Sequence, residues 1–248
     1  MASQILRTED LRKEFGPIHA VDGVDWTLES SETCGIIGPN GAGKTTFFNL
    51  VSGNVPPSAG EIYFRDERIT GQSMDKVARQ GIVKTYQIIN IFDSETVFEN
   101  IRVAAQQSES TYDMLRHHDS LTDVESRAES VVDRVGIAEF AETPAASLSY
   151  GDKRKLEIGI ALACDPKVVL LDEPTSGMGE AETGEVLELL TDLSADPELT
   201  IVIIEHDVEF ILDFVDRITV FHQGRVLADG PPMSIVDDDD VNRIYLEG

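Results

Sequence analysis

Residues 38–46 have the sequence Gly38-Pro39-Asn40-Gly41-Ala42-Gly43-Lys44-Thr45-Thr46. The stretch fits the phosphate-binding pattern G-x-x-x-x-G-K-[ST] at every constrained position. Its glycines let backbone N–H groups turn toward phosphate oxygens, and a helix starting near Lys44 adds the positive end of its dipole. Lys44 is placed to bind the β- and γ-phosphates, and the Thr45 hydroxyl to bind magnesium. An accidental glycine-rich turn is the alternative. An apolar strand (33–37) before the loop and an apolar helix (46–51) after it favour the phosphate site.

Two carboxylates follow an apolar strand in the second half of the chain. The strand covers residues 168–171, and Asp172 and Glu173 come directly after it. A buried parallel strand delivers such residues to a site at its C-terminal end. Asp172 is placed to hold magnesium, and Glu173 to polarise an attacking water. A further apolar strand (200–204) is followed closely by His206, which is therefore a third candidate for the same site.

The order of the apolar segments predicts an α/β chain. Residues 3–30 alternate in the manner of an antiparallel hairpin. Capping boxes at 96–99 and 122–125 open two helices in the middle third. We expect a single unit, 1–248, with a core of about 1–89 and 161–248 and a helical insertion at about 90–160.

Three residues outside these motifs allow both a functional and a structural interpretation. Ser149 precedes a predicted helix (153–164), and Gly151 has no side chain to cover the backbone there. This helix start is therefore either a second anion-binding site or an ordinary capped helix. Phe15 lies upstream of the phosphate loop. Its aromatic ring either stacks on an adenine ring or packs in the core.

Composition excludes several classes of protein. No apolar run approaches the ~18 residues needed to cross a bilayer, and residues 1–15 lack the apolar core of a secretory signal, so we expect a cytoplasmic location. Cys34 and Cys164 lie in apolar surroundings, which is typical of small buried side chains in a reducing compartment.

The charge of the chain is strongly negative. It has 46 acidic and 20 basic residues, a net charge of −26, and a pI of about 4.3. Nucleic acid is excluded as a partner, because binding it needs a basic surface. An acidic excess spread this evenly indicates a high-salt, halophile-like cytoplasm, where screening removes self-repulsion. An ordinary acidic protein with solvated faces is the alternative.

The ordered set of motifs resembles the ATP-binding subunit of an ABC transporter over essentially the whole chain. The motifs are residues 38–46, Gln87, Leu148-Ser149-Tyr150-Gly151-Asp152, residues 168–174 and His206. This resemblance implies a P-loop NTPase (RecA-like) core, an N-terminal antiparallel β subdomain and an inserted α-helical subdomain. It also implies ATP and Mg²⁺ as ligands, and ATP hydrolysis coupled to transmembrane transport.

The resemblance also assigns roles to individual residues. The expected ATP-binding residues are Phe15, Gly38, Pro39, Asn40, Gly41, Ala42, Gly43, Lys44, Thr45, Thr46, Ser149 and Gly151. The expected catalytic residues are Lys44, Gln87, Glu173 and His206, and the expected magnesium-binding residues are Thr45, Gln87 and Asp172. Ser149 and Gly151 are expected to contact ATP held by a second subunit, so that the working form is a head-to-tail dimer. Three residues depart from the commonest family pattern: Tyr150, Asp152 and Gly179.

Within the family, four stretches are similar to the ATPases of branched-chain amino acid importers: residues 148–162, 177–183, 205–211 and 241–246. Importers of urea or short amides, lipid or lipopolysaccharide exporters, and soluble ABC ATPases without transport remain alternatives. The importer reading implies integral-membrane permease subunits, an identical or sibling ATP-binding subunit, and a substrate-binding protein that acts through the permease. The chain would then be peripheral on the cytoplasmic side of the membrane. No residue of this chain is expected to select the solute.

Overall fold

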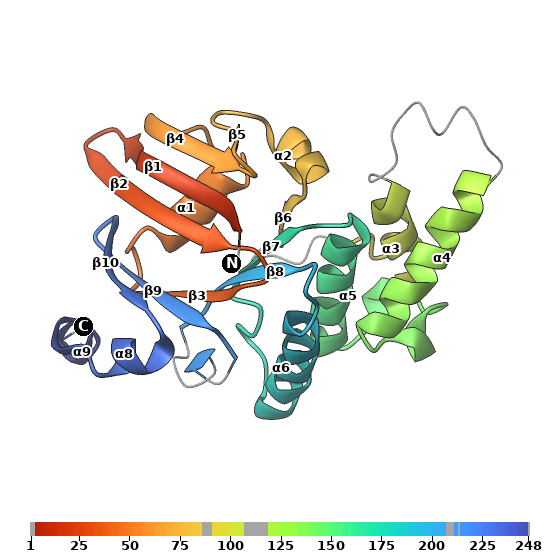
Figure 1. The fold of residues 1–248 in the computed structure, drawn as a ribbon. Coiled ribbons are helices and arrows are strands. Elements are labelled where there is room, and N and C mark those ends of the chain that lie inside the picture. The colour runs from red at the N-terminus through yellow and green to blue at the C-terminus, as the bar shows by residue number, and fades with distance from the viewer. Residues whose placement is uncertain (1–2, 86–90, 107–118, 207–210, 213, 248) are drawn as a thin grey trace.

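The computed structural model describes residues 3–85, 91–106, 119–206, 211–212 and 214–247. Two β-sheets form its frame, and helices pack around the larger one (Figure 1). Gln87, one of the predicted catalytic and magnesium-binding residues, lies outside the described residues.

The smaller sheet is antiparallel and has the strand order β2-β1-β4-β5. Its strands are β1 (Gln4–Phe15), β2 (Ile18–Glu29), β4 (Ala59–Phe64) and β5 (Glu67–Arg68). The β1–β2 hairpin closes with Phe15 opposite Ile18. Leu6, Leu11 and Leu28 are buried on its inner face, as the alternation of apolar residues predicts. The N-terminal antiparallel subdomain expected from the sequence is confirmed.

The larger sheet has the order β10-β9-β3-β8-β7-β6. Its strands are β3 (Thr33–Ile37), β6 (Ile82–Lys84), β7 (Val168–Asp172), β8 (Thr200–Ile204), β9 (Arg217–His222) and β10 (Arg225–Gly230). All pairs are parallel except β9 with β10. Strands β3, β7 and β8 are buried at every residue, which explains their unbroken apolar sequences. Their carboxyl ends share one edge, where the functional motifs meet.

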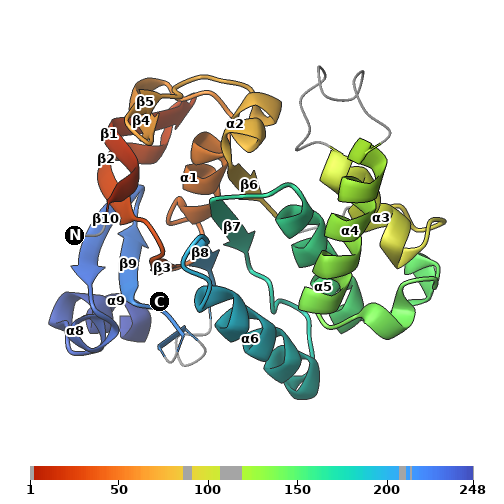
Figure 2. The same ribbon diagram turned by 45° about the vertical axis from the view of Figure 1, so that its right-hand side comes forward.

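Helices lie on both sides of this sheet and beside it. The helices next to the sheets are α1 (Lys44–Val51), α2 (Met74–Gln80), α6 (Glu180–Ser194), α8 (Pro232–Val236) and α9 (Asp239–Glu247). A group of three contacting helices, α3 (Val97–Ala105), α4 (Asp119–Arg134) and α5 (Tyr150–Ala163), stands to one side in both views (Figures 1 and 2). Among the described residues, no helix is both long and apolar enough to cross a membrane.

The helix starts test the capping predictions. The Thr96 side chain accepts the hydrogen bond from Glu99 N, as predicted for α3. Helix α4 was expected to start at the capping box of residues 122–125, but it begins at Asp119. No glycine or proline lies between 119 and 122. Nothing therefore stops the helix from extending backward by one turn.

One hydrophobic cluster joins the three-helix group to the sheet. It contains Ile101 of α3, Leu156 of α5, Leu171 of β7 and Leu190 of α6. A second cluster packs β3 and α1 against the smaller sheet, with Phe47 between Trp26 and Phe221. The first cluster runs without a break from the three-helix group to the sheet. The predicted division of the chain into a core and a helical insertion, at about residues 90 and 160, therefore stays a prediction.

Candidate functional site

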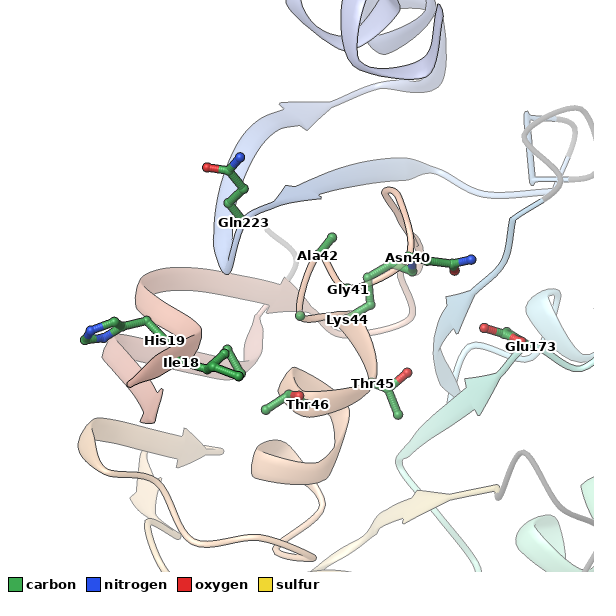
Figure 3. Close-up of a pocket in the computed structure, with 12 residues that line it drawn as sticks. Ile18, His19, Asn40, Gly41, Ala42, Lys44, Thr45, Thr46, Glu173 and Gln223 are labelled. Atoms are coloured by element: carbon green, nitrogen blue, oxygen red, sulfur yellow. The ribbon is translucent and has the colours of Figure 1, made fainter. Parts of the chain in front are cut away.

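A pocket of about 390 Å³ opens at the carboxyl edge of the large sheet, over the phosphate loop (Figure 3). It is lined by Ile18, His19, Ala20, Asn40, Gly41, Ala42, Gly43, Lys44, Thr45, Thr46, Glu173 and Gln223. The lining comes from β2, the β3–α1 loop, the first turn of α1, the residue after β7 and the β9–β10 turn. Figure 3 shows Glu173 on the opposite side of the loop from Ile18 and His19. The fold therefore brings the phosphate loop and one predicted acid to a single cavity.

Two glycines of the loop are required by close backbone packing. Gly38 has φ 148°, and a Cβ added there would lie 2.2 Å from the Phe221 carbonyl oxygen. Gly43 has φ 107°, and its Cβ would lie 2.3 Å from the Ala20 carbonyl oxygen. L-residues rarely adopt such φ angles, and these approaches leave no room for a methyl group. The loop can pass this close to β2 and β9 only with glycine at both positions.

Replacement of Gly43 by alanine is expected to lower the free energy of unfolding by about 2 to 5 kcal/mol, from backbone strain and overpacking together. Gly41→Ala is the matched control. Gly41 also has a positive φ, 79°, but no atom lies within 4 Å of its added Cβ, so a loss of only about 1 kcal/mol is expected. Urea unfolding of both variants measures the difference. Equal losses would show that the contact with Ala20 does not restrict the loop.

Lys44 is buried beneath the loop. Its Nζ donates hydrogen bonds to the carbonyl oxygens of Gly38 (2.5 Å) and Pro39 (3.2 Å). Burial lowers the pKa of Lys44, while Glu173 and Asp172 act in the opposite direction. The ammonium is thus held in the pocket by the loop itself. Thr45 follows it with an exposed side chain that also lines the pocket.

Glu173 and His206 face each other at the ends of neighbouring strands. His206 Nε2 lies 2.8 Å from Glu173 Oε1, with exposed side-chain fractions of 45% and 14%. The Glu173 backbone is in the left-handed region, φ 51°, and its N–H donates to Ile204 O on β8. That turn aims the carboxylate away from the sheet core and toward the pocket. Glu173 and His206 can therefore hold a water and accept its proton.

Glu205 supports the turn that carries Glu173. It is buried, and its carboxylate accepts hydrogen bonds from the N–H and hydroxyl of Thr175, at 2.9 and 2.7 Å. Burial raises the pKa of Glu205. The carboxylate ties the segment after Glu173 to the segment before His206, which sequence motifs alone did not indicate.

Asp172 fits a magnesium ligand. Its side chain is 1% exposed and Oδ2 lies 3.0 Å from Lys84 Nζ. This ion pair lacks hydrogen-bond geometry, and neither Asp172 oxygen accepts a hydrogen bond from the described residues. In the described part of the chain, no three His, Cys, Asp or Glu side chains form a metal cluster. Mg²⁺ at phosphates needs only one or two protein oxygens, which Asp172 and Thr45 can supply.

The predicted residues Ser149 and Gly151 lie at the start of α5 and do not line this pocket. Ser149 Oγ caps the helix by accepting from Asp152 N, and it donates to Asp152 Oδ2 at 2.7 Å. The Gly151 N–H donates to Glu182 Oε1, and the Tyr150 hydroxyl donates to Ser176 O. Tyr150 and Asp152, two departures from the family pattern, thus have local partners in the structure.

Phe15 also lies outside the pocket lining. It is half exposed at the end of β1, and Lys13 Nζ lies 5.0 Å from the centre of its ring. The neighbouring residues Ile18, His19 and Ala20 line the pocket instead, together with Gln223 from a distant turn. Sequence reasoning missed these four residues. No motif marks them, because only the folded chain brings them to the loop.

Comparisons with known proteins identify the family to which the chain is similar. Residues 21–176 match the family model described as "ABC transporter". The chain is 38% identical, over 99% of both sequences, to the high-affinity branched-chain amino acid transport ATP-binding protein LivG of Escherichia coli strain K12. It is 32% identical to the lipopolysaccharide export system ATP-binding protein LptB of Haemophilus influenzae, over 98% of this chain and 97% of that protein. It also superposes on a crystal structure of an ATP-binding cassette of an ABC transporter in its ADP conformation. The TM-score is 0.86, with 28% identity over 99% of this chain and 100% of the other.

Proposed function

This chain belongs to the ABC transporter family, and we propose that it is the ATP-hydrolysing subunit of an importer for branched-chain amino acids or a related small amide. The observation that carries the proposal is the pocket that Lys44 of the phosphate loop and Glu173 both line, with His206 in contact with Glu173. The family is an ATPase family, so hydrolysis of ATP follows from membership. The kind of solute is inferred from the 38% identity to the amino acid importer subunit.

In the proposed mechanism the loop holds the phosphates and Lys44 neutralises them. Backbone N–H groups of the loop and the start of α1 favour an anion at this place. Lys44 exchanges its carbonyl partners, Gly38 and Pro39, for phosphate oxygens. The phosphate oxygens carry negative charge, so they are strong hydrogen-bond acceptors for the Lys44 ammonium. Mg²⁺, held through Thr45 and Asp172, would neutralise charge on the phosphates.

Glu173 is the proposed general base. Its carboxylate can take a proton from the attacking water, and His206 can hold that water and the terminal phosphate from the other side. Gln87 keeps its predicted role at the magnesium and γ-phosphate as a proposal, since it lies outside the described residues. Phe15 likewise keeps the proposed role of stacking on adenine. Its ring is half exposed, and it precedes the pocket residue Ile18 by three positions.

The site is proposed to be completed by a second ATP-binding subunit. Ser149 and Gly151 present a capped helix start with a bare backbone, but they do not line the pocket of their own subunit. A head-to-tail dimer would bring this helix start to the nucleotide of its partner. The dimer partner is proposed to be a sibling subunit or a second copy of this chain.

Permease subunits are proposed to dock in a groove beside β6. The groove has a volume of about 380 Å³ and runs between α2 and β6 on one side and α3 and α5 on the other. Its lining is mostly apolar and includes Met74, Ala78, Ile160 and Ala161. Its lining includes Thr85, which precedes Gln87 by two residues in the sequence. Docking there would hold the chain peripherally on the cytoplasmic side of a membrane.

The lipopolysaccharide exporter remains the second candidate from the comparisons, at 32% identity against 38%. An importer of urea or short amides shares the same ATPase chemistry. None of the pocket residues is proposed to contact a transported solute in an importer or in an exporter. The companion subunits therefore decide which solute is moved and in which direction.

Isolation of the intact complex tests the proposed function. We expect the tagged chain to copurify from its native membranes, in high salt, with two permease subunits and a second ATPase. A binding protein that stimulates ATP hydrolysis by the reconstituted complex only with its amino acid bound would identify the importer. Copurification with lipid-export components, or with soluble proteins alone, would overturn the importer and leave the ATPase in place.

A further inference from the structure

Lys84 is a buried cation at the carboxyl end of β6, beside the proposed magnesium site. Its side chain is 6% exposed, and its Nζ lies 3.0 Å from Asp172 Oδ2. The same Nζ donates a 2.8 Å hydrogen bond to Asn49 Oδ1 on α1. Burial of an ammonium group is unfavourable unless an opposite charge and hydrogen-bond acceptors compensate it. Asp172 and Asn49 supply both, so Lys84 is fixed against the carboxylate.

Asp172 depends on Lys84 in turn. The carboxylate is 1% exposed, and neither of its oxygens accepts a hydrogen bond from the described residues. Lys84 thus neutralises the charge without occupying the oxygen lone pairs in good geometry. A buried carboxylate in this condition needs a cation nearby, and a metal ion that reaches its oxygens finds their lone pairs unused by hydrogen bonds from the described residues.

We propose that Lys84 is a positioning residue that holds Asp172 in the magnesium-free protein and competes with Mg²⁺ for its carboxylate. This rests on the proposed function, in which Asp172 faces the magnesium of the bound nucleotide. A cation next to a metal site lowers its affinity for a second cation by Coulomb repulsion. Lys84 therefore sets the free Mg²⁺ concentration at which the nucleotide site fills. It also lines the groove proposed for the permease, so a docked subunit would contact the residue that controls the carboxylate.

Two substitutions are expected to shift the magnesium requirement in opposite directions. Lys84→Met removes the charge and keeps the aliphatic stem. Half-maximal Mg²⁺ for binding of a fluorescent, non-hydrolysable ATP analogue should then fall about tenfold, as expected when a like charge leaves a partly buried site. Lys84→Arg presents a fork that pairs more strongly with a carboxylate, so half-maximal Mg²⁺ should rise about threefold. The arginine variant keeps a positive charge beside Asp172. It therefore still tests the proposal if the methionine variant does not fold.

Thermal unfolding gives a readout that does not depend on turnover. Without nucleotide, Lys84→Met should lower the melting temperature by about 5 °C or more, because the buried Asp172 loses the cation that it is paired with. Mg²⁺ with the ATP analogue should remove most of that deficit, since the metal replaces the missing charge. A lysine that served only packing would leave the same deficit in both states.

The proposal is supported if the half-maximal Mg²⁺ concentration is lowest for Lys84→Met, intermediate for the unaltered chain and highest for Lys84→Arg. An unchanged or reversed order, or an equal melting deficit with and without Mg²⁺ and analogue, would overturn it. Failure of the unaltered chain to bind the analogue at any Mg²⁺ concentration is a different result, because it contradicts the proposed function itself.

Discussion

Replacement of Glu173 by glutamine is expected to lower the rate of ATP hydrolysis by about 10² to 10⁴-fold, because a positioned general base contributes about that factor. Glutamine keeps the size of the side chain and can still bond to His206, which lies 2.8 Å from the carboxylate. It cannot accept a proton from the attacking water. Nucleotide binding should be retained, since the phosphates are held by the loop and Lys44.

Steady-state phosphate release and binding of a fluorescent ATP analogue separate the two effects. Glu198→Gln is a matched control, because Glu198 is an exposed surface residue paired only weakly with Lys167, at 3.5 Å. The control should leave both measurements unchanged. Undiminished hydrolysis in Glu173→Gln would show that another group is the base and would remove the main catalytic assignment.

Replacement of Lys44 by methionine is expected to weaken ATP binding by about 10²-fold. A hydrogen bond from a charged donor contributes about 1.5 to 3 kcal/mol, and Lys44 is placed to reach phosphate oxygens with more than one such bond. Methionine keeps the stem that fills the space under the loop. The loss should therefore fall on the affinity for phosphate rather than on the fold.

Binding is measured by titration of the fluorescent analogue, and thermal unfolding without nucleotide checks the fold. Lys167→Met is the control, because it removes a lysine at the opposite edge of the same sheet, before β7. An affinity within about twofold of the unaltered chain would contradict the placement of Lys44 at the phosphates. A large fall in melting temperature would instead assign Lys44 to holding the loop, through its bonds to Gly38 and Pro39.

Local sequence patterns predicted the elements that carry the site. The alternation in residues 3–30 predicted the β1–β2 hairpin, and the apolar runs before Asp172 and His206 predicted β7 and β8. These predictions held because periodicity and burial act over a few neighbouring residues. The predicted start of α4 was wrong, because no residue just before the capping box stops the helix from propagating past it. A high-salt origin of the acidic surface stays a prediction from composition.

By itself the sequence determined the family, the phosphate loop and the identity of the acids at the strand ends, since each depends on residue types at fixed spacing. Only the tertiary structure decided what surrounds them. It placed His19 and Gln223 in the pocket, put Glu205 behind the turn of Glu173, and set Lys84 against Asp172. These contacts join segments far apart in the chain, and they follow from sheet order and packing, which no local spacing encodes.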